Sequence, residues 1–391
     1  MSFFVKNQKE LSDLETIQKR QQKLQETWKK GEFSHVFAID EELSQSNQKN
    51  CENMVGAVAL PVGLAGPVRI IDEQQQTEEY FVPLATSEGA LVASASRGLK
   101  AINQAGGAQV MVKNFGMTRA PVFAFKNGNE AFNFAKYLEE EKTLKKIQQV
   151  TEATSSHLKF IKLMSFVRGR NVYVRFSFST DQAMGMNMVT IALQKLWEAF
   201  LSQYRGIKML ALSSNVCTDK KAAFINQLLG RGYGVQAEVF LSEEILQNVL
   251  KTNAQDFLRT HQAKNIIGSN VAGASSSNMQ FANVVAAFYM ATGQDLAHIV
   301  EASQGTTIVE NEEKGLYIAV NLPDLPFGSV GGGTNLPAQR ELRTLITKGQ
   351  KDLNASQLVT ILAVGVLAAE ISGLAALSNH SLASAHQRLA R

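Results

Sequence analysis

The chain has 391 residues, 45% of them apolar and 19% charged, with a formal net charge of +4. This length suffices for two or three domains with a sizeable core, and the small charge, without any Lys/Arg run, argues against a nucleic-acid-binding protein. Cys51 and Cys217 are the only cysteines and form no CxxC motif, so we expect a reducing compartment and neither a disulfide framework nor a cysteine zinc site. The polar N-terminus does not resemble a signal peptide, and we expect a cytoplasmic protein without a transmembrane segment.

Residues 1–50 are the most charged part of the chain and predict one amphipathic helix followed by a linker. Ser12 and Glu15 have the spacing of a capping box at the start of this helix. Apolar residues recur at helical spacing at Leu11, Leu14, Ile17, Leu24 and Trp28. We expect this N-terminal segment to pack on the body of the protein or on a partner subunit.

From Cys51 onward, glycine and proline interrupt the sequence, which is typical of loops and short strands. A strand is expected at residues 80–82, followed by a helix that reaches about residue 103. Thr86 or Ser87 can cap this helix, which would place Glu88 in its first turn. A carboxylate there can simply complement the helix dipole, worth under about 1 kcal/mol, so Glu88 alone carries no functional prediction.

Residues 121–213 predict an inserted domain with the order β-α-β-β-α-β, the ferredoxin-like unit. The expected strands are residues 122–125, 157–167, 171–179 and 207–212, and the expected helices are residues 129–141 and 187–201. The clearest strand is residues 171–179, where apolar and polar residues alternate. We therefore expect an α+β or α/β protein in which this small domain interrupts a large domain formed by residues 51–120 and 214–391.

The large domain is expected to surround a buried helix. Residues 284–291 are apolar on every side, which places a helix inside a large domain or a membrane, and this run is too short for a membrane, which takes about 20 residues. The helix leads to Asp295, which is either a surface residue in a turn or a carboxylate that needs a partner at the edge of the core. Other helices are expected at residues 222–229, 243–251 and 356–377, and a strand at residues 234–240.

Three polar segments could carry chemistry, and each also has an ordinary structural interpretation. Residues 181–188 lie between a strand and a helix, where backbone amides bind a pyrophosphate or merely form a turn. Residues 217–221 (CTDKK) either grip a carboxylate and polarise a carbonyl, or form a solvated surface. His380 is near the C-terminus, where histidines are often idle, as we expect for His386. No GxGxxG, P-loop or HExxH motif is present, so we expect neither an ordinary Rossmann site nor a metal.

Seven segments together resemble the catalytic portion of the 3-hydroxy-3-methylglutaryl-CoA (HMG-CoA) reductase family. In chain order they are ENMVG with PVGLAGP, LATSEGALVAS, GMTRAP, AMGMNM, CTDKK, KNIIGSNVAG with GQD, and GSVGGGTN, and they span about residues 51–381. Their common order makes the resemblance specific. The CTDKK and AMGMNM segments are more similar to archaeal and eukaryotic members than to the other bacterial class.

This resemblance implies a metal-free reduction of HMG-CoA to mevalonate and CoA, with two hydrides from NADPH or NADH and a lean towards NADPH. Lys220 would polarise the thioester carbonyl and hold the oxyanion, and Asp295 would lie between Lys220 and Glu88. Glu88, kept protonated by burial and by Asp295, would donate a proton to the aldehyde intermediate. His380 would protonate the departing CoA thiolate.

The resemblance also implies binding positions and a homo-oligomer whose active site is shared between subunits, with residues 52–56 at the dimer contact. The positions that would hold the HMG moiety are Arg119, Ser213, Asp219, Lys221, Lys264 and Asn283. The positions that would meet the cofactor are Ser155, Ser156, Gln182, Ala183, Met184, Gly185, Met186 and Asn187. Gln182 replaces a usual aspartate, and Ser156 replaces an arginine that meets the cofactor's 2′-phosphate, although His157 and Lys159 are nearby.

The sequence leaves two other functions open. The altered pocket around Ser156 is compatible with the same catalyst oxidising mevalonate with NAD. Gln182 motivates the second alternative, a CoA-ester-binding relative with little catalysis. Against the latter, Glu88, Lys220, Asp295 and His380 are all present, whereas a decayed enzyme would be expected to lose some of them.

Overall fold

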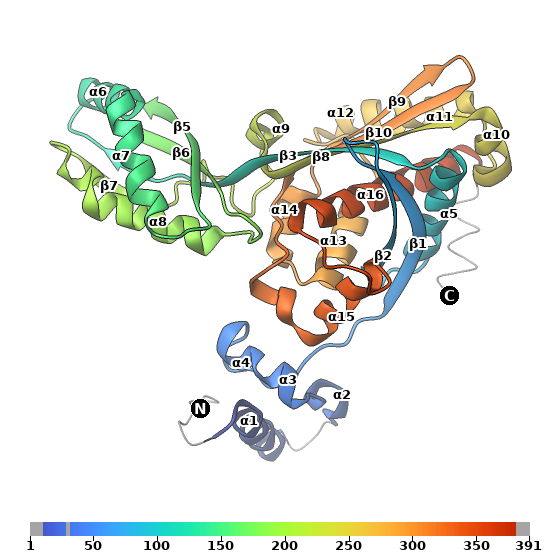
Figure 1. Ribbon diagram of the computed structural model, residues 1–391, viewed down its shortest axis with the longest axis horizontal. Coiled ribbons are helices and arrows are strands. Elements are labelled where there is room, and N and C mark those ends of the chain that lie inside the picture. The colour runs from blue at the N-terminus through green and yellow to red at the C-terminus, as the bar shows by residue number, and fades with distance from the viewer. Residues whose placement is uncertain (1–10, 29–31, 381–391) are drawn as a thin grey trace.

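The computed structural model describes residues 11–28 and 32–380. Two lobes lie side by side, and a helical N-terminal segment protrudes from the larger lobe (Figure 1). His386 lies outside the described residues.

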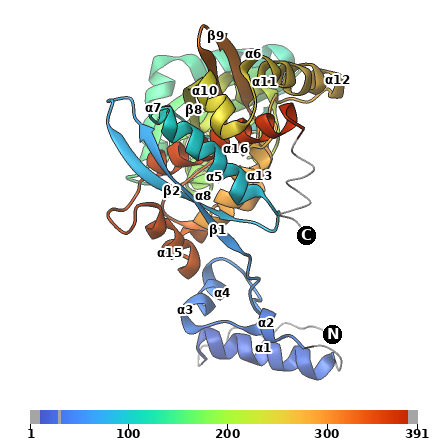
Figure 2. The ribbon, with the colours of Figure 1, turned by 90° about the vertical axis from the view of Figure 1, so that its right-hand side faces the viewer.

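The N-terminal segment is more structured than one helix and a linker. Its helices are α1 (Asp13–Thr27), α2 (Ser34–Phe37), α3 (Glu41–Ser44) and α4 (Ser46–Lys49). The predicted capping box of Ser12 and Glu15 is present at the start of α1. The buried Arg20 side chain donates to Asn47 Oδ1 at 2.6 Å and to the Met54 carbonyl at 3.1 Å, which holds the short helices against α1. The segment stands clear of most of the large lobe (Figure 2).

The large lobe consists of a mostly antiparallel sheet with helices packed on one face. Its strands are β1 (Val62–Ile71), β2 (Thr77–Ala85), β3 (Ala108–Arg119), β8 (Arg231–Ser242), β9 (Thr306–Glu312) and β10 (Gly315–Leu325). They lie in the order β2-β1-β3-β8-β10-β9, and β1 with β3 is the parallel pair. Two of these strands, β9 and β10, form a hairpin that the sequence did not predict.

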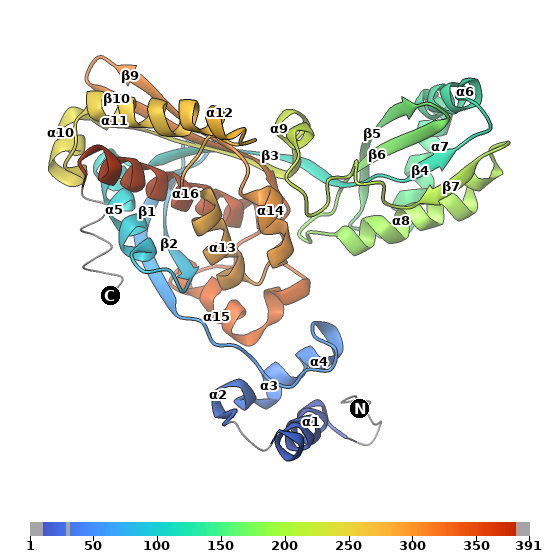
Figure 3. The ribbon, with the colours of Figure 1, turned by 180° about the vertical axis from the view of Figure 1, so that it is seen from behind.

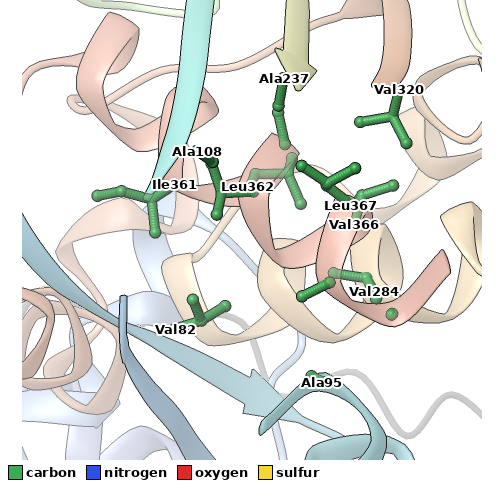
Figure 4. Packing of buried hydrophobic residues seen from close by; sticks show 14 of the residues in the cluster. Val82, Ala95, Ala108, Ala237, Val284, Val320, Ile361, Leu362, Val366 and Leu367 are labelled. Carbon is green, nitrogen blue, oxygen red and sulfur yellow. The ribbon is translucent and has the colours of Figure 1, made fainter. Parts of the chain in front are cut away.

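The helix at the centre of this lobe is α16 (Ala355–Ser378), which packs against the sheet, α5 (Leu91–Gln104) and α13 (Phe281–Thr292). Apolar side chains from β2, α5, β3, β8, α13 and β10 converge on it (Figure 4). By length and composition alone α16 could span a membrane, but 94% of its most apolar window is buried inside the protein. The predicted central helix, α13, is buried as expected and lies beside α16 (Figure 3).

The small lobe has the strand order of a ferredoxin-like unit. Its elements are β4 (Val122–Ala124), α6 (Gly128–Glu139), α7 (Glu141–Glu152), β5 (Lys159–Arg168), β6 (Asn171–Ser179), α8 (Met186–Ala199) and β7 (Lys208–Ala211). They form an antiparallel sheet in the order β7-β4-β6-β5. Helix α7 was not predicted, and it begins where Glu140 adopts an extended conformation after α6.

Strand β3 joins the two lobes, because its first part pairs with β8 and its last residues pair with β6. The change of partner occurs at Gly116, whose φ is +80°. A Cβ atom there would lie 2.7 Å from the Phe178 carbonyl oxygen, so only glycine lets β3 pass this closely. The remaining elements are η1 (Leu201–Gln203), α9 (Phe224–Leu229), α10 (Glu243–Ile245), η2 (Leu246–Leu250), α11 (Ala254–His261), η3 (Gln262–Gly268), α12 (Ser269–Ala272), η4 (Leu296–His298), α14 (Ile299–Ala302), η5 (Gly332–Asn335) and α15 (Pro337–Ile346).

Candidate active site

The closest pair of predicted catalytic residues is Lys220 with Asp295, whose Nζ and Oδ2 atoms are 2.8 Å apart. Asp295 follows α13, and its Oδ1 accepts the Ala297 N–H at 3.0 Å as the cap of η4. Helix α13 ends at Gly293, where a Cβ atom would lie 2.2 Å from the Gly333 carbonyl oxygen. This close approach places Asp295 beside the glycine-rich loop at residues 331–333.

The pKa of Asp295 lies below its usual value. Partial burial raises this pKa. Hydrogen bonds from Lys220 and the Ala297 N–H, together with the nearby positive charges, lower it by more than burial raises it. The carboxylate is therefore ionised beside the Lys220 ammonium. An ammonium group in this position is the kind of donor that can hold an oxyanion.

The backbone of Lys220 has a φ of +57°, which is unusual for a side chain of this size. Its N–H donates to Glu301 Oε1 at 3.0 Å. The same carboxylate oxygen accepts the Arg231 guanidinium at 2.8 Å, and Arg231 also donates to Asp219 Oδ1 at 2.9 Å. Arg231 and Glu301 are fully buried, so this network fixes the CTDKK loop from inside the protein.

Burial also acts on Asp324, whose Oδ1 lies 3.8 Å from the Arg231 guanidinium. Desolvation raises the pKa of Asp324 to about 7, with a further contribution from Glu301, while Arg231 and Arg175 oppose the shift. Asp219 meets a second arginine on its other side, since Arg119 lies 3.4 Å from its Oδ2. Arg119 also donates to Thr190 Oγ1 on α8 at 2.9 Å, which connects the CTDKK loop to the small lobe.

A cavity of about 510 Å³ opens beside Lys220 and Asp295, within the usual size range of ligand sites. Its other walls are the N-terminus of α8 and residues 330–334. Five predicted cofactor positions line the cavity: Ala183, Met184, Gly185, Met186 and Asn187. The first backbone N–H groups of a helix have no partner within the helix and suit an anion such as a pyrophosphate.

Gln182 has a different environment from the other predicted cofactor positions. Its Oε1 accepts the Ala355 N–H at 2.9 Å and the Ser329 hydroxyl at 3.2 Å. Its carbonyl accepts the Ser329 N–H at 2.8 Å. Gln182 thus links the loop before α8 to the glycine-rich loop and to the start of α16, and its amide oxygen is already engaged.

Ser155 and Ser156 lie in the turn after α7 and do not line the cavity. They are nevertheless close to the loop before α8, because His157 Nδ1 lies 2.8 Å from Asp181 Oδ2. The other nearby cation, Lys159, pairs with Glu152 at 3.2 Å. Each base that could meet a 2′-phosphate therefore already has a carboxylate partner.

Gly185 should be hard to replace in the cavity wall. Its φ is +83°, and a Cβ atom would lie 2.4 Å from the Thr180 Cβ. Gly185→Ala should lower the free energy of unfolding by about 2–5 kcal/mol, because a left-handed conformation costs about 1–2 kcal/mol and overpacking about 1–3. Gly169→Ala is the matched control, with φ +58° and open space around the Cβ, and should cost only about 1 kcal/mol. Urea unfolding measures both, and equal losses would contradict the steric argument.

Within one chain, Glu88 does not lie beside Asp295, and the neighbourhood expected for these two residues in a site shared between subunits stays a prediction. Glu88 lies exposed before α5, which begins at Leu91 rather than near Thr86, and its Oε1 accepts from Asn283 Nδ2 at 3.3 Å. Asn283 is in the first turn of α13, whereas Asp295 follows the last turn. Because α13 has 12 residues, its ends lie roughly 18 Å apart at about 1.5 Å per residue.

The predicted substrate positions also fall into two groups, one beside Lys220 and the other beside Glu88. Ser213 and Lys221 lie exposed in the loop that carries Lys220, and Ser213 Oγ is 3.2 Å from Cys217 Sγ. Lys264 is exposed on η3 beside the buried Asn265. Glu370, near the far end of α16, contacts Asn265 as well as the backbone N–H groups of residues 279 and 280. Lys264 and Asn283 therefore share the Glu88 end of the lobe.

His380 is likewise separated from the Lys220–Asp295 pair. It follows the C-terminal end of α16, beside residues 250–252, whereas the first N–H of α16 bonds to Gln182. A helix of 24 residues spans roughly 36 Å. Figure 1 shows this end of α16 on the side of the large lobe away from the small lobe.

One group among the described residues brings acidic and histidine ligand atoms within 4.8 Å of one another: Asp219, His298 and Glu301. Arg231 donates to both carboxylates of this group. Its guanidinium already supplies the positive charge that a metal ion would bring. We therefore interpret Asp219, His298 and Glu301 as a cluster organised around Arg231.

Comparisons with known proteins agree with the seven segments. The family model of hydroxymethylglutaryl-coenzyme A reductase matches residues 16–391. The chain belongs to this family. A 3-hydroxy-3-methylglutaryl-coenzyme A reductase of Methanocaldococcus jannaschii is 43% identical over 368 residues, covering 92% of this chain and 89% of the relative. The corresponding protein of Aeropyrum pernix is 44% identical and covers 88% of this chain and 82% of the relative.

The family assignment extends to the fold. The class II HMG-CoA reductase of Streptococcus pneumoniae, in a structure bound to NADPH, superimposes with a TM-score of 0.66 at 21% identity, covering 92% of this chain and 96% of that chain. The predicted α+β fold class is thereby confirmed. The higher identity to archaeal reductases agrees with the archaeal character of the CTDKK and AMGMNM segments.

Sequence reasoning missed the buried residues that support the reductase site, namely Arg231, His298 and Glu301. A signal for Arg231 was available, because it interrupts the apolar and glycine-rich run at residues 228–235. A charged residue in such a run needs buried partners. Nothing in the sequence indicated that those partners would be Asp219 and Glu301.

Proposed function

We propose that the chain is a cytoplasmic, biosynthetic reductase that converts HMG-CoA to mevalonate and CoA with two molecules of NADPH. The observation that carries this proposal is the Lys220–Asp295 pair, 2.8 Å apart, at the edge of a cavity whose far wall is the N-terminus of α8. A protonated lysine facing a site for a dinucleotide is what hydride transfer to a thioester carbonyl requires.

The cofactor would bind at the small lobe, residues 121–213, with its pyrophosphate at the N-terminus of α8. Gly185 and residues 331–333 allow the cofactor to approach the backbone closely. When bound, NADPH supplies the hydride. Lys220 would hold the oxygen of the carbonyl as negative charge develops on it, and the ionised Asp295 would position Lys220 through their ion pair. Asp219, fixed between Arg119 and Arg231, orients the loop that presents Lys220.

The active site would be completed by a second copy of the chain. Within one chain, Glu88 lies at the opposite end of α13 from Asp295, and His380 lies at the far end of α16. An exposed apolar row supports a dimer contact next to residues 52–56: Val58, Leu60, Val62 and Leu64 are each more than a third exposed. Glu88 of the partner subunit would then protonate the aldehyde intermediate, and His380 of the partner subunit would protonate the CoA thiolate.

Absorbance at the nicotinamide band tests the proposed reaction directly. Purified protein with HMG-CoA should oxidise two molecules of NADPH for each CoA released. No oxidation of NADPH or NADH by a folded protein that binds HMG-CoA would contradict the proposal and favour a CoA-ester-binding relative.

One observation favours the alternative of an NAD-linked enzyme that oxidises mevalonate. Carboxylates of Asp181 and Glu152 pair with His157 and Lys159, and these carboxylates would repel a 2′-phosphate in the same place. A clearly higher kcat/KM with NADH than with NADPH in the same assay would support this alternative.

A further inference from the structure

His298 is a buried histidine in the cavity wall, and one of its ring nitrogens has no hydrogen-bond partner. Its side chain is 1% exposed, and its Nδ1 lies 2.7 Å from Glu301 Oε1. Its Nε2 makes no hydrogen bond and lies 3.6 Å from Asp295 Oδ2 and 3.9 Å from Asp219 Oδ1. The free nitrogen therefore points at the carboxylate that holds Lys220.

The contacts of Glu301 indicate where the ring carries its protons. Glu301 Oε1 also accepts the Lys220 N–H and the Arg231 guanidinium, so it acts as an ionised acceptor and Nδ1 carries a hydrogen towards it. An unprotonated Nε2 would then face two carboxylate oxygens with its lone pair, which is repulsive. A proton on Nε2 turns the same contacts into attraction.

Charged and titratable groups on several elements interact with this ring or with the carboxylates beside it. They are Arg119 on β3, Asp219 and Lys220 in the loop before α9, Arg231 on β8, Tyr289 on α13, Asp295 before η4, Glu301 on α14 and Asp324 on β10. The two groups nearest to Nε2 are both acidic.

We propose that His298 is a positioning residue of the reductase that holds a proton and acts on Lys220 through Asp295. This proposal rests on the role of Lys220 in the proposed function. After the first hydride transfer, Lys220 gives a proton to the oxygen that it holds, and the proton on His298 Nε2 moves to Asp295 Oδ2. Asp295 passes it to Lys220 Nζ, which restores the ammonium. His298 is left neutral, and one proton from solvent restores it before the next turnover. Glu88 of the partner subunit takes the proton of the new hydroxyl when the CoA thiolate leaves, and it returns the proton to the same oxygen in the second reduction, so each turnover takes one proton through His298 and one through His380. Distances slightly beyond hydrogen-bond length are common before substrate binds.

The first test is chemical rescue of His298→Ala. The variant should lose about 10²-fold in kcat, the usual contribution of a proton-transfer group, with the KM for HMG-CoA changed by less than about threefold. Added imidazole should restore turnover, with rates that follow the pKa of a series of substituted imidazoles. His298→Gln, which keeps the volume, should lose the alkaline limb of the wild-type pH profile. His261→Gln is the control, since His261 is buried outside the cavity, and its profile should match the wild type.

Two results would overturn the proposal while the wild type is active: His298→Gln with wild-type kcat and pH profile, or a loss in a folded His298→Ala that no imidazole restores. An inactive wild type would instead refute the proposed function. The ¹⁵N chemical shifts of the His298 ring, assigned by difference from His298→Gln, give a measurement that does not need activity. The inference requires a proton on each ring nitrogen, and an Nε2 that carries no proton would contradict it.

Discussion

Replacing Lys220 with alanine should reduce the turnover of HMG-CoA by about 10³-fold. The reason is that loss of one donor to a developing oxyanion commonly costs 10²- to 10³-fold in kcat, and Lys220 also carries the charge that balances Asp295. Both reduction steps build an oxyanion, so the reduction of free mevaldehyde should fall with that of the thioester. Steady-state assays with each substrate measure the two losses.

The matched control is Lys348→Ala, because Lys348 pairs with Glu79 at 3.6 Å on the surface, where ion pairs contribute little. This variant should keep its activity within about twofold. In Lys220→Ala the pKa of Asp295 should rise, since the hydrogen bond and charge that lower it are gone, and its carboxyl should protonate at higher pH than in the wild type. Near-normal turnover in a folded Lys220→Ala would refute the role of Lys220.

Periodicity predicted the small lobe well because its strands and helices each bury one face. Residues 171–179 were expected as a strand and form β6 with the same bounds. The pairing order β7-β4-β6-β5 follows from the order of the elements along the chain. In the large lobe, α16 was expected as a helix at residues 356–377 and forms within two residues of these bounds. Its position at the centre of the lobe was not predicted, because a helix buried on all sides lacks an amphipathic pattern that would show which face packs on what.

The position of Glu88 shows what sequence could not supply for the site. The segment LATSEGALVAS, which contains Glu88, resembles the family. The distance from Glu88 to Asp295 within one chain depends instead on α13, because the two residues lie at opposite ends of this helix. Gln182 is a second example. Its amide oxygen bonds to Ala355 and Ser329, residues more than 140 positions away along the chain, and no local pattern predicts such contacts.

Mixed dimers should recover activity that neither parent has. Glu88→Gln and Lys220→Ala should each be inactive as homodimers. In a two-fold symmetric dimer, one of the two sites would combine Lys220 from the Glu88→Gln chain with Glu88 from the Lys220→Ala chain. Both of these residues are unchanged, so this site would be active, whereas the other site would carry both substitutions. Purified mixed dimers should therefore show about half of the wild-type activity. The control pair is Lys220→Ala with Asp295→Asn, which should recover nothing, because Lys220 and Asp295 belong to the same chain in each site.

The most direct measurement is the rate of NADPH oxidation by mixed dimers of Glu88→Gln and Lys220→Ala, carrying different affinity tags and purified through both. Recovery to about half of the wild-type rate, with no recovery in the Lys220→Ala and Asp295→Asn pair, is the result we expect for a reductase site built from two chains. A rate no higher than that of either parent homodimer would contradict it and would require Glu88 to reach Lys220 within a single chain.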